Sequence, residues 1–202
     1  MNRPHFFAPS ERNKQPILEQ LKKVLPARAH VLEIGSGLGQ HAIHFCKTLT
    51  GLKWQASEKG DSIADLMEEL SSAGISNIAP PLALDVVADE WPIREFDAVY
   101  AANTAHIMSW EAVSAMFGGT GTILVPGGLF CLYGPFNIDG KYTSEGNRDF
   151  DRNLRSRNPK MGIRDLGELE RLAGSHQMFL QERISMPANN FLLVFEKRVE
   201  QE

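Results

Sequence analysis

A glycine-rich loop is the first segment whose residue types and spacing could bind a ligand. Gly35, Gly37 and Gly39 follow a short apolar run and precede a helical pattern. Glycines in such a turn let a ligand approach the backbone closely. A dinucleotide-binding loop would place its third glycine at position 40, where this chain has Gln40. The spacing therefore disfavours a nicotinamide-dependent dehydrogenase, which is retained as an alternative.

Three acidic residues stand at the expected ends of three successive strands. Glu33 lies just before the glycine loop, where its charge would repel a pyrophosphate but attract an ammonium or sulfonium group. Glu58 follows the loop by about 20 residues, the spacing of an acid that binds ribose hydroxyls. Asp85 can accept a hydrogen bond from an exocyclic amine. One such acid is often solvated or caps a helix, but three beside a glycine loop indicate a ligand site.

The elements that must position these residues alternate between strand and helix. Strand–helix units repeat about five times and lead to two closing strands joined by a short connection, which favours an antiparallel hairpin. Alternation predicts an α/β fold with a parallel sheet and helices on both faces, and a ligand beyond the carboxyl ends of the strands. The expected strands are residues 31–34, 52–57, 78–84, 97–101, 129–133, 179–186 and 191–197.

Two details of the pattern carry separate predictions. Asn13 is expected to cap a first helix that Pro26 ends. Pro80 and Pro81 lie within the third expected strand, and proline lacks the N–H that a ladder needs. This strand is therefore expected at the edge of the sheet or with a late start.

Composition and charge narrow the class of protein. The 202 residues are 43% hydrophobic and 23% charged, which excludes a largely disordered or membrane-embedded chain and suits a single globular domain. The net charge of -4 disfavours nucleic acid as a partner. Cys46 and Cys131 are expected as buried free thiols in a reducing compartment. The polar N-terminus does not look like a secretory signal, so a cytoplasmic location is expected.

Several segments resemble the class I S-adenosylmethionine-dependent methyltransferases. Residues 31–39 look like that family's first motif, 96–100 like its fourth strand and 126–129 like the turn before its fifth strand. The resemblance covers residues 29–198. It implies a Rossmann-like sheet of seven strands, mostly parallel with a C-terminal antiparallel hairpin and with helices on both faces.

The same resemblance implies S-adenosylmethionine as the cofactor. Glu58 matches the acid that binds ribose, and Asp85 with Val86 matches the position that binds adenine. Asn103 is expected at the amino-acid end of the cofactor. The expected cofactor-binding residues are Arg12, Asn13, Glu33, Gly35, Ser36, Gly37, Gly39, His41, Glu58, Asp85, Val86 and Asn103.

A closer resemblance runs nearly from end to end. Segments 10–17, 103–107, 133–136 and 162–165 are similar to the uncharacterised family called domain of unknown function 938, whose animal member is methyltransferase-like protein 26. This similarity implies the fold and the cofactor, and the family's substrate is not established. It suggests one methyltransferase-like domain in four parts. These are an N-terminal cover and helix (1–28), a cofactor-binding core (29–140), a lid or acceptor insertion (141–165) and a C-terminal helix and hairpin (166–202).

Methyl transfer from a sulfonium needs the nucleophile, the methyl group and sulfur in a row, and orientation alone lowers the barrier by roughly 7–11 kcal/mol. A general base is needed only where the nucleophile must first lose a proton. His106 and Tyr133, which follow or end the fourth and fifth strands, are the catalytic candidates. Each could instead be a local structural residue. A small molecule is the expected acceptor, with a protein side chain as the alternative, and a non-catalytic binding module with this fold is the rival function.

The segment 148–164 is rich in arginine and is the candidate acceptor region. Arg148, Arg152 and Arg155 fall on one helical face, where they could receive an acidic acceptor or simply be solvated. The six histidines are scattered, so no metal site is expected. The sequence leaves the oligomeric state open.

Overall fold

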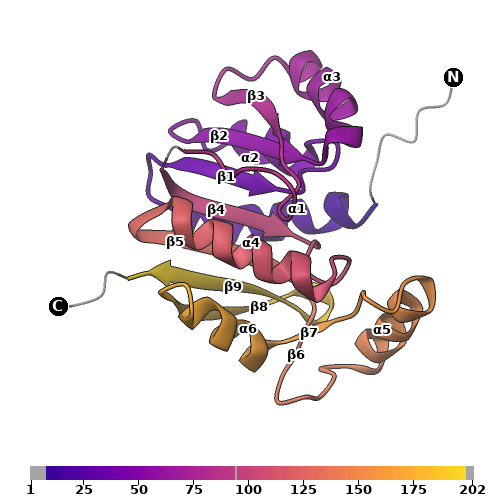
Figure 1. The fold of residues 1–202 in the computed structure, drawn as a ribbon. Helices are drawn as coiled ribbons and strands as arrows, with labels where there is room; N and C mark the ends of the chain where they lie inside the picture. The colour runs from indigo at the N-terminus through magenta and orange to yellow at the C-terminus, as the bar shows by residue number, and fades with distance from the viewer. Residues whose placement is uncertain (1–7, 94, 199–202) are drawn as a thin grey trace, which may run out of the picture. The chain divides into compact units, whose positions relative to one another are not determined.

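The computed structural model describes residues 8–93 and 95–198, which Figure 1 draws in colour. Contacts within the chain divide it into two compact units, Met1–Asp85 and Val86–Glu202, called here the first and the second unit. Residues 1–7 of the expected N-terminal cover lie outside the described residues. The glycine loop and its three acids belong to the first unit, whereas both catalytic candidates and the three arginines belong to the second.

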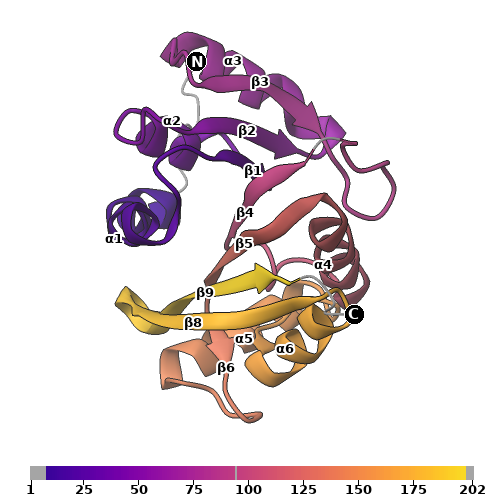
Figure 2. The same ribbon diagram turned by 90° about the vertical axis from the view of Figure 1, so that its left-hand side faces the viewer.

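The first unit is a parallel sheet of three strands in the order β3-β2-β1, with three helices packed around it (Figure 2). Ile34 pairs with Ser57, and Glu58 pairs with Ala83, so the carboxyl ends of the three strands are adjacent. The elements in chain order are α1 (Ala8–Val24), β1 (His30–Ile34), α2 (Gln40–Cys46), β2 (Lys53–Glu58), η1 (Gly60–Ser62), α3 (Ile63–Ala73) and β3 (Ile78–Ala83).

The proline-containing strand β3 lies at the edge of the sheet, as predicted. Pro80 is exposed and Pro81 half-buried, which suits a strand that pairs on one side only. By contrast, residues 54–57 of β2, which has a neighbour on each side, are all buried. The two prolines, which have no N–H to donate, thus lie in a strand that has a neighbour on one side only.

The prediction that Asn13 caps the first helix is wrong. Helix α1 begins at Ala8, so Asn13 lies inside it and is buried, with only 9% of its surface exposed. Its side chain is bonded to His41 of α2, against which α1 packs. This contact and the buried Ile17 and Leu18 stabilise a longer helix than the sequence pattern indicates, even with Pro16 inside it.

The second unit contains a four-stranded sheet in the order β4-β5-β9-β8. Strands β4 and β5 are parallel, and β9 runs antiparallel to both β5 and β8. The predicted C-terminal hairpin is therefore confirmed. Helices α4 and α6 lie side by side on one face of this sheet (Figures 1 and 2). The elements are β4 (Phe96–Ala102), α4 (Trp110–Ile123), β5 (Leu124–Gly134), α6 (Leu166–Gly174), β8 (Met178–Met186), η2 (Pro187–Asn189) and β9 (Asn190–Lys197).

The three-stranded and four-stranded sheets together contain seven strands, which are parallel apart from the C-terminal hairpin. This confirms the predicted Rossmann-like class. The described residues between β3 and β4 form turns, so the predicted strand–helix alternation is interrupted there. The cause is visible in the sequence, because Pro92 and four acidic residues between positions 85 and 95 leave this segment without a helical apolar pattern.

The predicted insertion 141–165 carries a helix, α5 (Glu145–Arg157), that Figure 1 shows apart from α4 and α6. The Ser144 hydroxyl accepts a hydrogen bond from the Asn147 N–H and so caps α5. Two short strands pair in parallel, β6 (Phe136–Asn137) just before the insertion and β7 (Arg164–Asp165) at its end. The insertion therefore begins and ends at one place in the second unit.

The two cysteines are buried free thiols, as expected. Burial raises the pKa of each thiol to about 12, so neither is a reactive thiolate at neutral pH. Among the helices in the described part of the chain, none has the length and apolar character needed to cross a membrane.

Candidate cofactor and active sites

The glycine loop is fixed to the end of β2 by hydrogen bonds. The Ser36 N–H donates to the Ser57 carbonyl at 2.9 Å, and the Ser57 N–H donates to the Ser36 hydroxyl at 3.1 Å. Gly35, Gly37 and Gly39 have φ angles of 71°, 57° and 76°, in the left-handed region that glycine adopts most easily. The predicted ligand loop is therefore a preformed turn. Ser57 was missed from the sequence, where it appears only as an ordinary strand residue.

Gly39 is also required by packing, which predicts a large loss of stability in Gly39→Ala. A Cβ atom there would lie 2.7 Å from Leu70 Cδ2 and 3.1 Å from Leu66 Cδ1, both in buried side chains of α3. We expect Gly39→Ala to lower the free energy of unfolding by about 2–4 kcal/mol, as the sum of the left-handed backbone and overpacking costs. Urea unfolding measures this free energy in the variant and the wild type.

Gly74→Ala is the matched control for that variant. Gly74 has φ 62°, but a Cβ there would meet nothing within 4 Å. It should therefore lose only the backbone part, about 1–2 kcal/mol. Equal losses in the two variants would mean that α3 adjusts freely and that the packing argument is wrong.

Glu58 joins the end of β2 to the glycine loop. Its Oε2 accepts from the Gly37 N–H at 2.8 Å, and its Oε1 accepts from the Lys59 N–H at 2.9 Å. Asp85 follows β3 and pairs with the Lys59 ammonium at 2.8 Å. The Leu84 N–H donates to the Glu58 carbonyl, which keeps the two strand ends together. The structure thus brings two of the predicted acids together at the carboxyl ends of the first unit's strands. Lys59, a cation that was not predicted, lies between them.

Glu33 is the third acid, and it is almost completely buried. Its Oε2 accepts from the Trp54 indole N–H at 3.0 Å, and 2% of the residue is exposed. Burial raises the pKa of Glu33 to about 7, against hydrogen bonds from Trp54 and Ser36 that act to lower it, and the Glu58 charge adds to the rise. Near neutral pH this carboxyl is close to its midpoint, so a nearby cation would ionise it.

The raised pKa of Glu33 predicts a pH-dependent difference between the wild type and Glu33→Gln. The folded wild type keeps a proton that the unfolded chain releases above its ordinary pKa of 4.5, so its stability falls as pH rises from 4.5 to about 7. The glutamine side chain of the variant does not titrate but keeps an oxygen for Trp54. From about pH 5 to 8, urea unfolding should show Glu33→Gln gaining about 2–3 kcal/mol relative to the wild type. If the difference in the free energy of unfolding between the two proteins stayed constant from pH 5 to 8, this would contradict the raised pKa of Glu33.

Helix α1 contacts the glycine-loop helix α2 through side-chain pairs. His41 Nε2 lies 2.8 Å from Asn13 Oδ1, and the His41 ring stacks on Phe45. Burial lowers the pKa of His41 to about 4, so the ring is neutral. A second pair, Gln40 to Glu11 at 2.8 Å, was missed from the sequence. Arg12, in contrast, is exposed on α1.

In the second unit, Asn103, His106 and Tyr133 lie at the ends of β4 and β5. Asn103 directly follows β4 with φ 57°, and its N–H donates to the Tyr133 carbonyl at 2.9 Å. Tyr133 is 3% exposed. A Cβ atom at Gly134 would lie 3.7 Å from His106 Nδ1, which places the imidazole beside the end of β5. Val86 is buried, and its carbonyl accepts from the Trp91 indole N–H.

The His106 imidazole is neutral over the whole physiological range. Burial lowers its pKa to about 4, and the charge of Arg164 acts in the same direction. Its ring meets the Phe150 ring edge-on, with 5.2 Å between the centroids. A neutral imidazole at a strand end has the form that a general base needs.

The three candidate arginines of α5 each have an acidic partner. Arg148 pairs with Glu145, Arg152 Nη1 lies 3.3 Å from Asp149 Oδ1, and Arg155 Nε lies 2.8 Å from Asp151 Oδ2. The acidic partners Glu145, Asp149 and Asp151 all lie in α5, and the helical spacing of the arginines did not predict these pairs. The cationic face that the helical spacing predicts is therefore largely neutralised within α5 itself.

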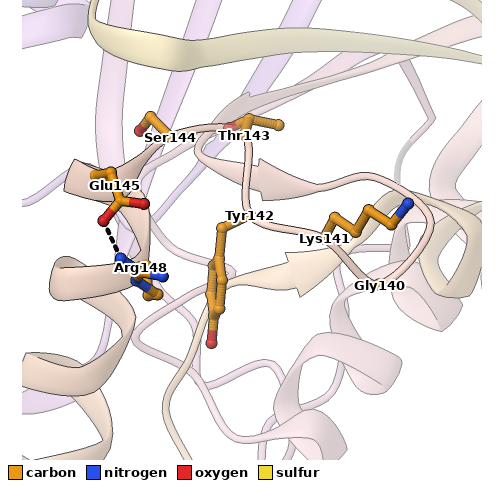
Figure 3. A pocket seen from close by; sticks show the side chains of 7 residues that line it. All are labelled: Gly140, Lys141, Tyr142, Thr143, Ser144, Glu145 and Arg148. Atoms are coloured by element: carbon orange, nitrogen blue, oxygen red, sulfur yellow. Dashed lines mark hydrogen bonds and ion pairs between the residues drawn. The ribbon is translucent and has the colours of Figure 1, made fainter.

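A cavity of about 420 Å³ opens where the insertion turns into α5, lined by residues 140–145 and Arg148 (Figure 3). Figure 3 shows Lys141 pointing away from Arg148, so the two cations do not converge on one position. Of the arginines proposed for an acceptor site, Arg148 lines this cavity. Within the described residues, no group of three or more His, Cys, Asp or Glu side chains is arranged to hold a metal ion.

Comparisons with known proteins identify the family and the fold. The model of the family DUF938, described as a protein of unknown function, matches residues 5–197. An O-methyltransferase family protein from Burkholderia thailandensis is 13% identical, with a TM-score of 0.80, and the match covers 95% of this chain and 58% of that one. Human N-acetylserotonin methyltransferase, solved in complex with S-adenosylmethionine, is 14% identical with a TM-score of 0.79, covering 94% and 53%.

A third solved structure is an O-methyltransferase family 2 protein from Planctomyces limnophilus in complex with apigenin. It is 14% identical with a TM-score of 0.74, and the match covers 91% of this chain and 61% of that one. At these identities the likeness shows the fold. This chain spans little more than half the length of these neighbours.

Proposed function

This chain belongs to the DUF938 family of proteins of unknown function, and we propose that it is an S-adenosylmethionine-dependent methyltransferase that acts on a small molecule. One observation carries the proposal. In the first unit, Glu58 lies against the glycine loop and Asp85 stands beyond the neighbouring strand, the places suited to ribose and adenine. The solved neighbours, one of them bound to S-adenosylmethionine, support it.

The residues of the first unit fit this cofactor chemically. An ionised carboxylate offers about four acceptor positions, and Glu58 uses two of them for backbone N–H groups. Two remain for the hydroxyls of a ribose. Buried Glu33, close to its pKa, can supply a negative charge for a cationic ligand. When bound, the cofactor supplies an electrophilic methyl group on sulfur.

In the second unit, His106 is the proposed general base. Its neutral ring can accept the proton of an acceptor hydroxyl, and the Phe150 ring beside it excludes water from one side. Tyr133 and Asn103 are proposed to help hold the acceptor and the amino-acid end of the cofactor. Arg148, Arg152 and Arg155 remain proposed acceptor contacts, and Arg12 and Asn13 remain proposed parts of the cover.

A small-molecule acceptor is supported by the neighbours, one of which is bound to apigenin and another of which is a mitomycin 7-O-methyltransferase. We further propose a cytoplasmic location, because a reducing compartment keeps Cys46 and Cys131 as thiols.

Calorimetry and a product assay test the function. S-adenosylmethionine should bind, and NAD should bind at least about tenfold more weakly, a difference of 1.4 kcal/mol. S-adenosylhomocysteine should form when the low-mass fraction of a cell extract is added. Comparable binding of NAD would overturn the cofactor assignment. Binding without product in any extract fraction would favour the non-catalytic module, and product only with the protein fraction would identify a protein acceptor.

A further inference from the structure

The loop after β4 that carries His106 is held by the far end of the insertion. The Gly162 N–H donates to the His106 carbonyl at 2.9 Å. Arg164 is 9% exposed, and its guanidinium donates from Nε to the Ala105 carbonyl at 3.0 Å and from Nη2 to the Met108 carbonyl. Backbone groups at, before and after His106 are therefore bonded to residues 162–164.

Asp151 of α5 is hydrogen-bonded to that same segment. The residue is 1% exposed. Its Oδ1 accepts from the Ile163 N–H at 2.6 Å, and its Oδ2 accepts from Arg155 Nε and from the Tyr142 hydroxyl, each at 2.8 Å. Burial acts to raise the pKa of this carboxyl, but these bonds together hold it below its ordinary value. Asp151 is thus ionised, and both of its carboxylate oxygens accept hydrogen bonds. The residue thereby connects α5 to residues 162–164.

Gly162 allows the ion pair of Asp151 and Arg155 to lie close to the backbone. Its φ is 151°, and a Cβ atom there would lie 2.4 Å from Arg155 Nη2 and 2.9 Å from Asp151 Oδ1. The ion pair therefore packs directly on the backbone whose N–H reaches His106. Phe150, the neighbour of Asp151 in α5, meets the His106 ring. Helix α5 consequently acts on both the backbone and the ring of His106.

We propose that Asp151 and Arg164 are positioning residues for His106. Through them, helix α5 fixes the position of the loop after β4. Neither side chain bonds the imidazole. Asp151 acts through Ile163 and Gly162, and Arg164 acts through the carbonyls on both sides of His106. The proposal rests on the proposed function for the role of His106 as a base, but the placement of the ring is tested without any acceptor.

Nuclear magnetic resonance of ¹⁵N-histidine-labelled full-length protein provides the test, with His106→Gln assigning the His106 ring signals. In Asp151→Asn and Arg164→Lys, the ring signals should shift in the folded protein, and the pKa of His106 should rise toward its ordinary 6.5 as the loop relaxes. Asp149→Asn is the matched control. It changes the exposed Asp149–Arg152 pair on the same helix and should leave the ring signals in place.

A merely structural role gives a different result. Asp151→Asn and Arg164→Lys would then lower the free energy of unfolding while the His106 signals and pKa stayed as in the wild type, and this would overturn the proposal. If Asp151→Asn does not fold, Tyr142→Phe replaces it, because it removes one bond to Asp151 from a side chain that is 41% exposed. S-adenosylmethionine titration of each variant keeps the two proposals distinct, since a failure of the wild type to bind would overturn the proposed function alone.

Discussion

His106→Gln should bind S-adenosylmethionine as tightly as the wild type but form S-adenosylhomocysteine roughly 100-fold more slowly, the lower end of what a general base contributes, because a pKa near 4 makes His106 a weak base. Glutamine approximates the size of the imidazole but cannot take a proton at neutral pH. His106 is not one of the proposed cofactor contacts, and Glu58 and Asp85, proposed for ribose and adenine, lie in the first unit, so binding and turnover should separate. Calorimetry and product formation with the active extract fraction measure the two quantities.

His44→Gln is the control, because His44 is a partly exposed histidine of α2 in the first unit. It should keep both binding and turnover. The pH dependence adds a second criterion. Because burial holds the pKa of His106 near 4, the base form persists well below neutrality, and turnover should not fall between about pH 8 and 6 on account of this residue. Equal turnover of His106→Gln and wild type would show that orientation alone suffices for this acceptor.

Local sequence signals predicted those parts of the fold that depend on local physics. The prolines of β3 placed it at a sheet edge, and the short connection at 187–190 predicted the antiparallel hairpin. Asn13 was misplaced for the opposite reason. Its type favours a cap, but a buried bond to His41, 28 residues away, stabilises it inside α1. A single sequence contains no signal for that partner.

The candidate sites divide in the same way. Glu58 was found because its distance along the chain from the glycine loop is itself a signal, and the structure bonds it to Gly37. The arginines of α5 were found by helical spacing, yet their partners neutralise most of that charge. No sequence pattern singled out Asp151. Its importance comes from burial and from a bond to Ile163, which depends on how the chain returns after α5.

Glu58→Ala should weaken S-adenosylmethionine binding by about tenfold or more. Loss of a charged hydrogen bond costs roughly 1.5–3 kcal/mol, and 1.4 kcal/mol is a factor of ten in affinity. The structure adds a second reason, because the same carboxylate accepts the Gly37 N–H and so helps to hold the loop that the cofactor would meet. Glu58→Gln separates the two contributions. It keeps an acceptor for one backbone N–H but offers fewer positions to ribose, so its affinity should fall between those of the wild type and Glu58→Ala.

Asp61→Ala provides the control for this series, since Asp61 is exposed in η1, three residues beyond Glu58, and should bind as the wild type does. Calorimetry gives the affinities, and urea unfolding shows whether each variant is folded under the conditions used. If folded Glu58→Ala binds with unchanged affinity, the carboxylate serves only to bond the loop, and the ribose must be held elsewhere. A loss shared equally by S-adenosylmethionine and adenine would also contradict the assignment, because adenine has no ribose for Glu58 to bind.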